Sequence, residues 1–488
     1  MREFWFGVFG SIIGVLAGAA IVVTAAGFLL SAILASLTDD MAASPAVSAA
    51  DSLVLEIDLR GLEVDDDGGP PHLGDGSEAV SAVDIVRALE LAANDPHMSG
   101  AILYIGGRAE IRAGHAEEIA LAMRRLASTG RRVVGYVENA DHAGLPGYLL
   151  AAGAAEVWAS PLARLDANSA RDMRFPPPET FTTARITLAA RLRDRAPDAV
   201  AALYASGPVT AMAAQEAGLI DRLGSDHDAR SRALGDSGPV LIGLGAYLAR
   251  AAGGRSGENL ALIAADGLIV SGRLRDAQHP PAAFAAALAD AIDSAAGDNS
   301  VRAIVVRISS PGGDPSAADQ IAAAIRRAQA AGKPVVASIG SVANSWAYHA
   351  IAPADRIVTP SLAAVGGLGS QSDQLPASLT QRTAGSDDRA RNRVAEQRYL
   401  ALLEGVSESR SLPLARVDAL ARGQLWTGAE AVELGLADEI GGLHKAAARA
   451  RELAGVPGGE TVVLTPYPAA SSRIETALSR LGDWLSEP

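Results

Sequence analysis

The sequence matches itself at a separation of about 200 residues, and this internal repeat limits what the chain can fold into. Four segments recur in the same order in both halves: 52–59 matches 259–266, 100–105 matches 302–307, 130–137 matches 332–339, and 210–221 matches 427–438. Solenoid repeats are far shorter, roughly 20–50 residues. The sequence therefore predicts two related domains.

Short apolar runs alternate with alanine-rich segments within each half. The apolar runs have the length of buried strands, and helices are expected at 79–93, 116–128 and 317–331. This alternation is typical of βα crossover units around a largely parallel sheet. The expected fold class is therefore α/β.

Changes in composition suggest the domain boundaries. The first α/β domain is expected at residues 51–225 and the second at 258–456. Residues 226–257 are rich in Gly, Ser, Asp and Arg and are predicted to be a linker. Residues 457–488 form a tail that ends in an amphipathic stretch, 472–485, which we interpret as a solvated capping helix rather than a membrane or partner contact.

The N-terminal segment has the length and polarity of a membrane span. Residues 4–38 contain no charged side chain, and about 20 apolar residues cross the core of a bilayer. We expect residues 1–40 to anchor the chain in the cytoplasmic membrane. Arg2 before the span and Asp39 after it favour a cytoplasmic N-terminus, with the bulk of the chain on the periplasmic or extracytoplasmic side. The alternative is a cleaved export signal.

Charge and cysteine content exclude several classes of function. The net charge of −14 argues against nucleic-acid binding, which requires a basic surface. The chain has no cysteine, so disulfides, thiolate metal sites and cysteine nucleophiles are excluded.

The second half carries residues suited to acyl transfer. A buried-strand pattern at 301–308 is followed by Gly312 and Gly313, whose backbone N–H groups can face a carbonyl oxygen. The next strand, at 335–339, is followed by Ser345 at the start of a helix. Parallel sheets place their sites where such strand ends meet. Ser345 is therefore a candidate nucleophile, although a turn glycine pair and a helix-capping serine are the simpler explanations.

The first half lacks these polar groups. Leu145 occupies the position of Ser345, and Ala109-Glu110 stands near the position of the Gly-Gly pair. A third glycine-rich loop, 366–369, follows the strands of the second half. The candidate site is therefore confined to the second half.

These residues resemble peptidase family S49, in its long signal peptide peptidase A form. Segments 331–340 and 424–438, together with Gly312, Gly313 and Ser345, carry the resemblance. It covers nearly the whole chain after residue 52 and implies two tandem crotonase-like domains after one transmembrane helix. It also implies that Ser345 is the nucleophile and that Gly312 and Gly313 form the oxyanion hole, with no metal and no cofactor.

The resemblance further implies partners and substrates. Family members degrade cleaved signal peptides at the outer face of the cytoplasmic membrane. The long form assembles into a homo-oligomeric ring, usually a tetramer. Peptides and the membrane are thus the expected partners.

The chain departs from the family at two places. Two glycines usually follow the family's serine, whereas Trp346 and Ala347 follow here, and a tryptophan is expected to crowd or reshape the cleft. The family's general base is a lysine of the first domain, but residues 160–204 contain none. Arginine cannot replace it, because its pKa keeps it protonated. The chain has two lysines, Lys333 and Lys445.

No substitute base is evident. Lys333 opens a strand whose far end leads to the site, and Lys445 has the surroundings of a solvated helix charge. His349 follows Ser345 by one helical turn and is most simply a core or rim histidine. Asp314 is most simply a turn residue. The general base stays unassigned.

Three hypotheses follow. The chain is an active serine peptidase whose base comes from a repositioned residue or a neighbouring subunit, or it is a peptidase-derived scaffold that binds peptides without cleaving them. An acyl-CoA enzyme of the wider crotonase class is the third, and the anchor and residues 424–438 disfavour it.

Overall fold

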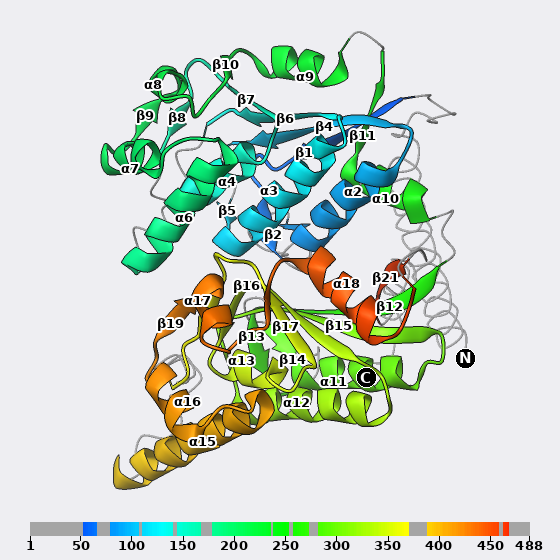
Figure 1. Cartoon of the computed structure of the whole chain (residues 1–488), viewed down its shortest axis with the longest axis vertical. Helices are drawn as coiled ribbons and strands as arrows, with labels where there is room; N and C mark the ends of the chain where they lie inside the picture. Colours follow the sequence, from blue (N-terminus) through cyan, green and yellow to red (C-terminus); the bar gives the residue numbers. More distant parts are fainter. Residues whose placement is uncertain are drawn as a thin grey trace, which may run out of the picture. The chain divides into compact units, whose positions relative to one another are not determined.

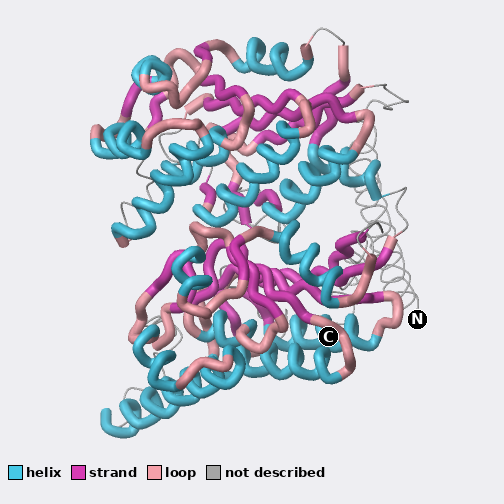
Figure 2. The backbone as a smooth tube through the Cα atoms, viewed as in Figure 1, coloured by secondary structure: helices cyan, strands magenta, loops and turns pink. Residues whose placement is uncertain are grey.

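The computed structural model describes residues 52–65, 79–106, 110–139, 144–166, 178–235, 238–252, 257–272, 282–369, 388–457 and 462–467. All of them lie in one compact unit, Ser52–Pro488. Two large sheets form this unit, each with helices on both faces (Figures 1 and 2). The predicted α/β fold with largely parallel sheets is confirmed.

The first sheet is wholly parallel, with strand order β10-β7-β6-β4-β1-β11. Its strands are β1 (Leu53–Asp58), β4 (Met98–Ile105), β6 (Arg132–Val137), β7 (Glu156–Ala159), β10 (Arg222–Leu223) and β11 (Val240–Gly243). The helices of this half are α2 (Ala82–Asn94), α3 (Ala113–Ser128), α4 (Gly144–Ala152), α6 (Glu179–Leu192), α7 (Pro197–Ala205), α8 (Ala211–Glu216), α9 (Asp226–Leu234) and α10 (Leu244–Ala252). Its short strands are β2 (Glu63–Asp65), β3 (Ala79–Ser81), β5 (Glu110–Ile111), β8 (Arg164–Leu165) and β9 (Val209–Thr210).

The second sheet has the order β19-β18-β16-β15-β12-β21, with β17 beside β16 and β20 beside β17. Only the β18–β19 pair is antiparallel among these described strands. The strands are β12 (Glu258–Asp266), β15 (Val301–Ser310), β16 (Val335–Asn344), β17 (Arg356–Thr359), β18 (Ala364–Gly366), β19 (Leu425–Thr427), β20 (Glu439–Ile440) and β21 (Val462–Pro466). The short β13 (Leu268–Val270) pairs with β14 (Ala282–Phe284). The helices are α11 (Ala285–Gly297), α12 (Pro315–Ala330), α13 (Trp346–Ile351), α15 (Asp388–Arg410), α16 (Leu414–Leu420), α17 (Gly428–Glu433) and α18 (Leu443–Leu453).

The two sheets repeat one strand order: β7-β6-β4-β1-β11 corresponds to β17-β16-β15-β12-β21. Both sheets also have a bulge at the start of the strand pairing, which places Gly100 opposite Val54 and Ala303 opposite Leu260. With residues 130–137 matched to 332–339, Ala101 opposite Val133 corresponds to Ile304 opposite Val335, so residues 100–105 correspond to 303–308 and the match with 302–307 was wrong by one residue. The place of Arg307 is taken by Tyr104 in the first half.

Apolar side chains at helical and strand spacing form the core of the second half. Helix α12 starts at an N-cap, Asp314, whose carboxylate accepts from the Ala317 N–H. Its buried alanines and isoleucines pack with α11, α13 and one face of β12, β15 and β16. The other face of the sheet packs against α18 and against Val83 of α2, which belongs to the first half.

Two segments predicted to lie outside the domains are parts of the sheets. Residues 226–257, predicted as a linker, contain α9, β11 and α10, and β11 is the edge strand beside β1. The tail after residue 456 contributes β21, which pairs with β12. Both strands are short apolar runs flanked by glycine and polar residues, so only the pairing with a distant strand distinguishes them from loops.

Within the described ranges, no helix has the length and apolarity that crossing a membrane requires. The predicted anchor at 1–40 and the predicted helix at 472–485 lie outside the described residues.

Candidate active site

Ser345 occupies a strained turn between β16 and α13. Its backbone has φ +52° and ψ −115°, a conformation that is uncommon for a residue with a side chain. Its N–H donates to the Gly366 carbonyl at 2.6 Å, and its carbonyl accepts from the His349 N–H at 3.0 Å. The residue is fully buried. Strain of this kind clusters at functional sites, and hydrolases hold nucleophilic serines on such strand-to-helix turns.

The Gly-Gly pair lies directly beside this turn. Gly312 and Gly313 have φ of +123° and +149°, which favours glycine. A methyl group on Gly312 would lie 3.4 Å from the Asn344 carbonyl oxygen and 3.9 Å from Ser345 Cβ. The Gly312 N–H donates to Ser310 Oγ at 3.2 Å. The structure thus brings Ser345 and Gly312 together from two strand ends.

Gly313 is held by the small strand β13. The Ile269 N–H donates to the Gly312 carbonyl at 2.9 Å, and the Asp314 N–H donates to the Ile269 carbonyl at 2.8 Å. In a parallel bridge of this kind, the N–H of the intervening residue points away from the partner strand. The Gly313 N–H is therefore directed away from β13. The Trp346 N–H belongs to the first turn of α13, where N–H groups have no partner within the helix.

The third glycine-rich loop also meets the serine turn. Besides the bond from Ser345 to Gly366, strand β18 pairs along β16 from Val342 to Asn344. At Gly367 a Cβ atom would lie 1.7 Å from Asn344 Oδ1. Only glycine fits there, so this loop closes tightly over the end of β16.

Trp346 directly follows Ser345 and packs into the core. Its side chain is 4% exposed and belongs to the core cluster of the second half. Its ring meets the His349 ring edge to face, with centroids 5.3 Å apart. The first turn of α13 thus directs the indole into the core, and its expected effect on the shape of the cleft stays a prediction.

Three of the four candidate bases have other roles. Lys333 Nζ donates to the carbonyls of Asp298 and Val301 at 2.9 and 2.5 Å, at the start of β15. Strand β16 is 10 residues long, about 33 Å, so Lys333 lies at the end opposite Ser345. Lys445 pairs with Glu439 at 3.1 Å on the exposed side of α18. Asp314 caps α12, as the expected turn residue.

His349 packs away from solvent, one turn after Ser345. Nε2 lies 3.7 Å from Asp319 Oδ1, the imidazole faces Gly405 of α15, and Nδ1 has no hydrogen-bond partner among the described residues. Burial lowers the pKa of His349, although the Asp319 carboxylate opposes the shift. The neutral imidazole is favoured. These contacts agree with a core histidine.

The segment expected to carry the family's lysine does reach the second half. Helix α6 contacts β19, and β19 pairs with β18 next to the serine turn. Residues 167–177, where the lysine loop is expected, lie outside the described residues. The sequence there contains arginine but no lysine.

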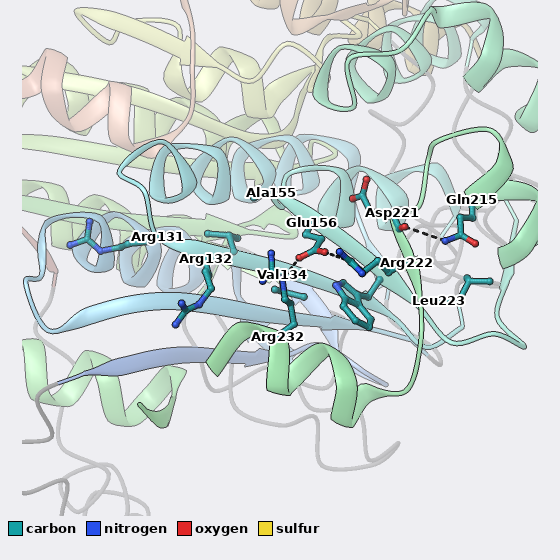
Figure 3. Close-up of a pocket in the computed structure, with 12 residues that line it drawn as sticks. Arg131, Arg132, Val134, Ala155, Glu156, Gln215, Asp221, Arg222, Leu223 and Arg232 are labelled. Carbon is teal, nitrogen blue, oxygen red and sulfur yellow. Dashed lines mark hydrogen bonds and ion pairs between the residues drawn. The ribbon is translucent and has the colours of Figure 1, made fainter. Parts of the chain in front are cut away.

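A large cavity lies elsewhere, in the first half (Figure 3). Its volume is about 690 Å³, and Arg131, Arg132, Glu156 and Trp158 are among its lining residues. Glu156 bridges Arg222 and Arg232 at its wall. These groups surround the amino ends of β6 and β7, whereas parallel sheets place sites at carboxyl ends. In the second half Glu439, on β20, pairs with Lys445 and Arg449 of α18, so both halves have a carboxylate between two cations at this end of the sheet.

Two buried serines beside the site were not singled out from the sequence. Ser309 Oγ accepts from the Ser341 N–H at 3.2 Å, and Ser341 Oγ accepts from the Gly114 N–H at 3.1 Å. The sequence does distinguish them, since each is a polar residue in an otherwise apolar strand. No group of three or more His, Asp or Glu side chains in the described ranges could hold a metal ion.

Parts of the chain are similar to known proteins. Residues 378–457 match Peptidase family S49. Protease 4 of Haemophilus influenzae is 30% identical over 218 residues, 40% of this chain and 35% of that protein. The chloroplastic serine protease SPPA of Arabidopsis thaliana is 29% identical over 256 residues, 47% of this chain and 37% of that protein. The chain thus matches little more than a third of either relative's length. A solved membrane-bound stomatin-specific protease covers 40% of this chain and 86% of its own, with 14% identity and a TM-score of 0.28.

Proposed function

We propose that the chain is a member of peptidase family S49 and a membrane-anchored serine endopeptidase of the signal peptide peptidase A type, a proposal supported by the family match of residues 378–457 and by the similarity to Protease 4 and chloroplastic SPPA. Its substrates are cleaved signal peptides, and its two halves are tandem crotonase-like domains, with α9 and β11 counted in the first. The protein works as a homo-oligomer, a tetramer, on the outer face of the cytoplasmic membrane. No metal or cofactor takes part.

One observation carries this proposal: Ser345 sits on a strained strand-to-helix turn with Gly312 against it. In the proposed reaction, Ser345 Oγ attacks the scissile carbonyl carbon and its proton passes to a base. The N–H groups of Gly313 and Trp346 stabilise the oxyanion. Collapse breaks the C–N bond, and the amine leaves with a proton. Water then hydrolyses the ester and restores Ser345.

The base comes from a neighbouring subunit or from a repositioned side chain. Lys333 and Lys445 are both engaged away from Ser345 within the chain. Serine alone is a weak nucleophile at neutral pH, so labelling and turnover are expected to rise with pH as the base loses its proton.

A fluorophosphonate probe tests the proposal. We expect the purified, oligomeric full chain to be labelled, and Ser345→Ala to abolish both labelling and turnover of leader peptides. Leu145→Ala, at the matching position of the first half, is the control and keeps both. A folded sample that takes up no probe would contradict the proposal.

The engagement of both lysines favours a second candidate, a membrane-bound scaffold that binds peptides without cleaving them. Anisotropy of a fluorescent leader peptide separates the two. Binding without labelling or cleavage supports the scaffold, whereas turnover that is lost in Ser345→Ala excludes it.

A further inference from the structure

Strand β16 carries a wide bulge just before Ser345. Ile308 pairs with Ile339, but the next pair is Ser310 with Ala343, so β16 advances four residues while β15 advances two. Before the bulge β16 pairs with β17, and after it with β18. Bulges of this kind redirect a strand and are frequent next to active sites. The direction in which Ser345 is presented therefore depends on the bulge.

The first half of the chain holds this bulge in place. The Gly114 N–H, in the first turn of α3, donates to Ser341 Oγ at 3.1 Å. Such first-turn N–H groups need a partner outside their helix. A Cβ atom on Gly114 would lie 2.4 Å from the Gly340 carbonyl oxygen, so the two backbones are in direct contact.

Arg112, the N-cap residue of α3, extends the contact to the neighbouring strands. Its Nη1 donates to Ser309 Oγ at 3.2 Å and pairs with Asp266, at the end of β12, at 3.1 Å. Ser309 Oγ in turn accepts from the Ser341 N–H at 3.2 Å. Ser309 and Asp266 are buried, so water does not replace these bonds.

A second anchor lies one turn further along α3. Glu118 and Arg307 form a buried ion pair at 2.5 Å, with side chains 3% and 1% exposed. Arg307 also donates to Ser338 Oγ at 3.0 Å, and the Leu443 N–H donates to Glu118. Helix α3 is thereby fixed on β15, β16 and the start of α18.

In the first sheet, the described pairing of β4 with β6 is regular up to its last pairs, Tyr104 with Tyr136 and Ile105 with Val137. Residues 107–109 and 140–143, which follow these pairs, lie outside the described residues. In the second half, the bulge, the serine and the Gly-Gly pair occur together, and the first half holds the bulge.

We infer that the start of α3 is a positioning element for the nucleophile: Arg112 and Gly114 fix the Gly340–Val342 bulge through Ser309 and Ser341 and so set the Ser345 turn. These are positioning residues, since none contacts the reacting atoms. The inference deepens the proposed function and rests on it for its catalytic consequence.

Ser341→Ala and Gly114→Ala test the inference in the full-length protein. A displacement of about 1 Å costs on the order of 10²-fold in rate, so we expect fluorophosphonate labelling of Ser345 to slow by roughly 10- to 100-fold. Affinity for a leader peptide is expected to change less than about threefold, by the same reasoning. Ser341→Thr keeps the hydroxyl acceptor and is expected to restore labelling.

Ser225→Ala is the matched control. Ser225 Oγ also accepts a first-turn helix N–H, that of Asp228, at 3.2 Å, but in α9 of the first half. It is expected to lower the melting temperature without slowing labelling. If Ser341→Ala and Gly114→Ala are labelled as fast as the wild type, the inference is overturned while the proposed function stands.

Hydrogen exchange decides the inference even in a protein that takes up no probe. We expect faster exchange at residues 342–349 in Ser341→Ala and Gly114→Ala, and unchanged exchange there in Ser225→Ala. A folded but unlabelled wild type contradicts the peptidase proposal. Unchanged exchange at 342–349 in both α3-contact variants overturns the positioning inference.

Discussion

Helix α4, which follows β6, and helix α13, which follows β16, share structural contacts but differ in the residues at their starts. Tyr148 donates to the Leu219 carbonyl at 3.0 Å, and Tyr348 donates to the Leu436 carbonyl at 2.6 Å. Each tyrosine lies in the helix that follows its strand. These bonds recur in both halves, so they serve the fold rather than a reaction.

A second pair of contacts repeats in the same way. Asp221 accepts from the Val157 N–H, and Asp438 accepts from the Ile357 N–H, both at 2.7 Å. Each carboxylate also binds an arginine of the helical segment before it. These carboxylates are thus excluded as candidates for chemistry, because the same contacts recur in both halves.

The differences gather at the carboxyl ends of β15 and β16. Ser345 replaces leucine. Gly313 pairs with Ile269 of β13 as Ile111 pairs with Val64 of β2, so Gly312 and Gly313 replace Glu110 and Ile111, one residue later than the expected Ala109-Glu110. On the face of the second sheet that packs against the first half, Arg307 stands at the position of Tyr104 in the first sheet. Arg307 pairs there with Glu118 of the first half. The comparison shows that the first half has the same scaffold as the second and that its helix α3 supports the candidate site of the second half.

Exchanging the two turn residues gives the largest expected effect. Ser345→Leu is expected to reduce fluorophosphonate labelling by roughly 10³-fold or more, because the nucleophile is gone. Leu145→Ser, added to that variant, is expected to restore none of it, since the first half lacks the Gly-Gly pair. Labelling is measured by mass spectrometry of peptic peptides. Labelling of a peptide from the first half would contradict the comparison, because it would show that the shared scaffold alone makes a serine at this position reactive.

Removing Glu118 tests how much the packing of α3 on the second sheet contributes to stability. Glu118→Ala removes the carboxylate that pairs with the buried Arg307 charge, which is expected to lower the free energy of unfolding by about 3–5 kcal/mol. Arg60→Ala, whose partner Asp58 is 44% exposed, is the matched change on the first sheet and is expected to cost about 1 kcal/mol or less. Chemical denaturation measures both.

A double variant separates charge from packing at this site. Glu118→Leu combined with Arg307→Met removes both charges and is expected to regain most of the lost stability, since apolar replacements of buried ion pairs are often neutral. If the double variant is as unstable as Glu118→Ala, the packing of α3 on the second sheet matters more than the ion pair.

Gly312→Ala is expected to act on the site rather than on the fold. The methyl group would stand 3.9 Å from Ser345 Cβ, on a backbone with φ +123°. Disturbing an oxyanion loop costs on the order of 10²-fold, so labelling is expected to slow by that factor. Gly61→Ala, at φ +79° with open space around it, is expected to cost only about 1–2 kcal/mol of stability. Equal labelling rates in the two variants would show that Gly312 is not part of the active site.

The fold class and the centre of the site follow from local sequence, and the rest does not. Alternating apolar runs predicted the α/β fold, and loops at strand ends identified Gly312, Gly313 and Ser345, which the structure brings together. Their catalytic roles stay predictions. Strand β16 was predicted to end at 339 because Gly340 and Ser341 interrupt it, yet it continues through a bulge to Asn344.

The supporting contacts could not be predicted, because they join distant parts of the chain. The bond from Gly114 to Ser341 spans 227 positions, and the bond from Arg112 to Ser309 spans 197. Edge strand β11 was hidden in a Gly- and Ser-rich stretch, since it is defined only by pairing with β1. A glycine at a helix start has no local signal for the backbone that it will touch.

His349→Leu tests the smallest expected difference between the halves: the dependence of stability on pH that His349 adds, whereas its counterpart Leu149 cannot titrate. Leu149 occupies this place in the first half, and both side chains are buried. Because burial lowers the pKa of His349 below its unfolded value near 6.5, the unfolded chain binds more protons around that pH. The stability contributed by neutral His349 is therefore full above pH 6.5 and is lost as the pH falls through 6.5 toward the lowered pKa. Melting temperatures of the wild type are expected to decline more steeply over this range than those of His349→Leu. Parallel curves would mean that Asp319 offsets the burial of the imidazole, and that the histidine behaves like the leucine it replaces.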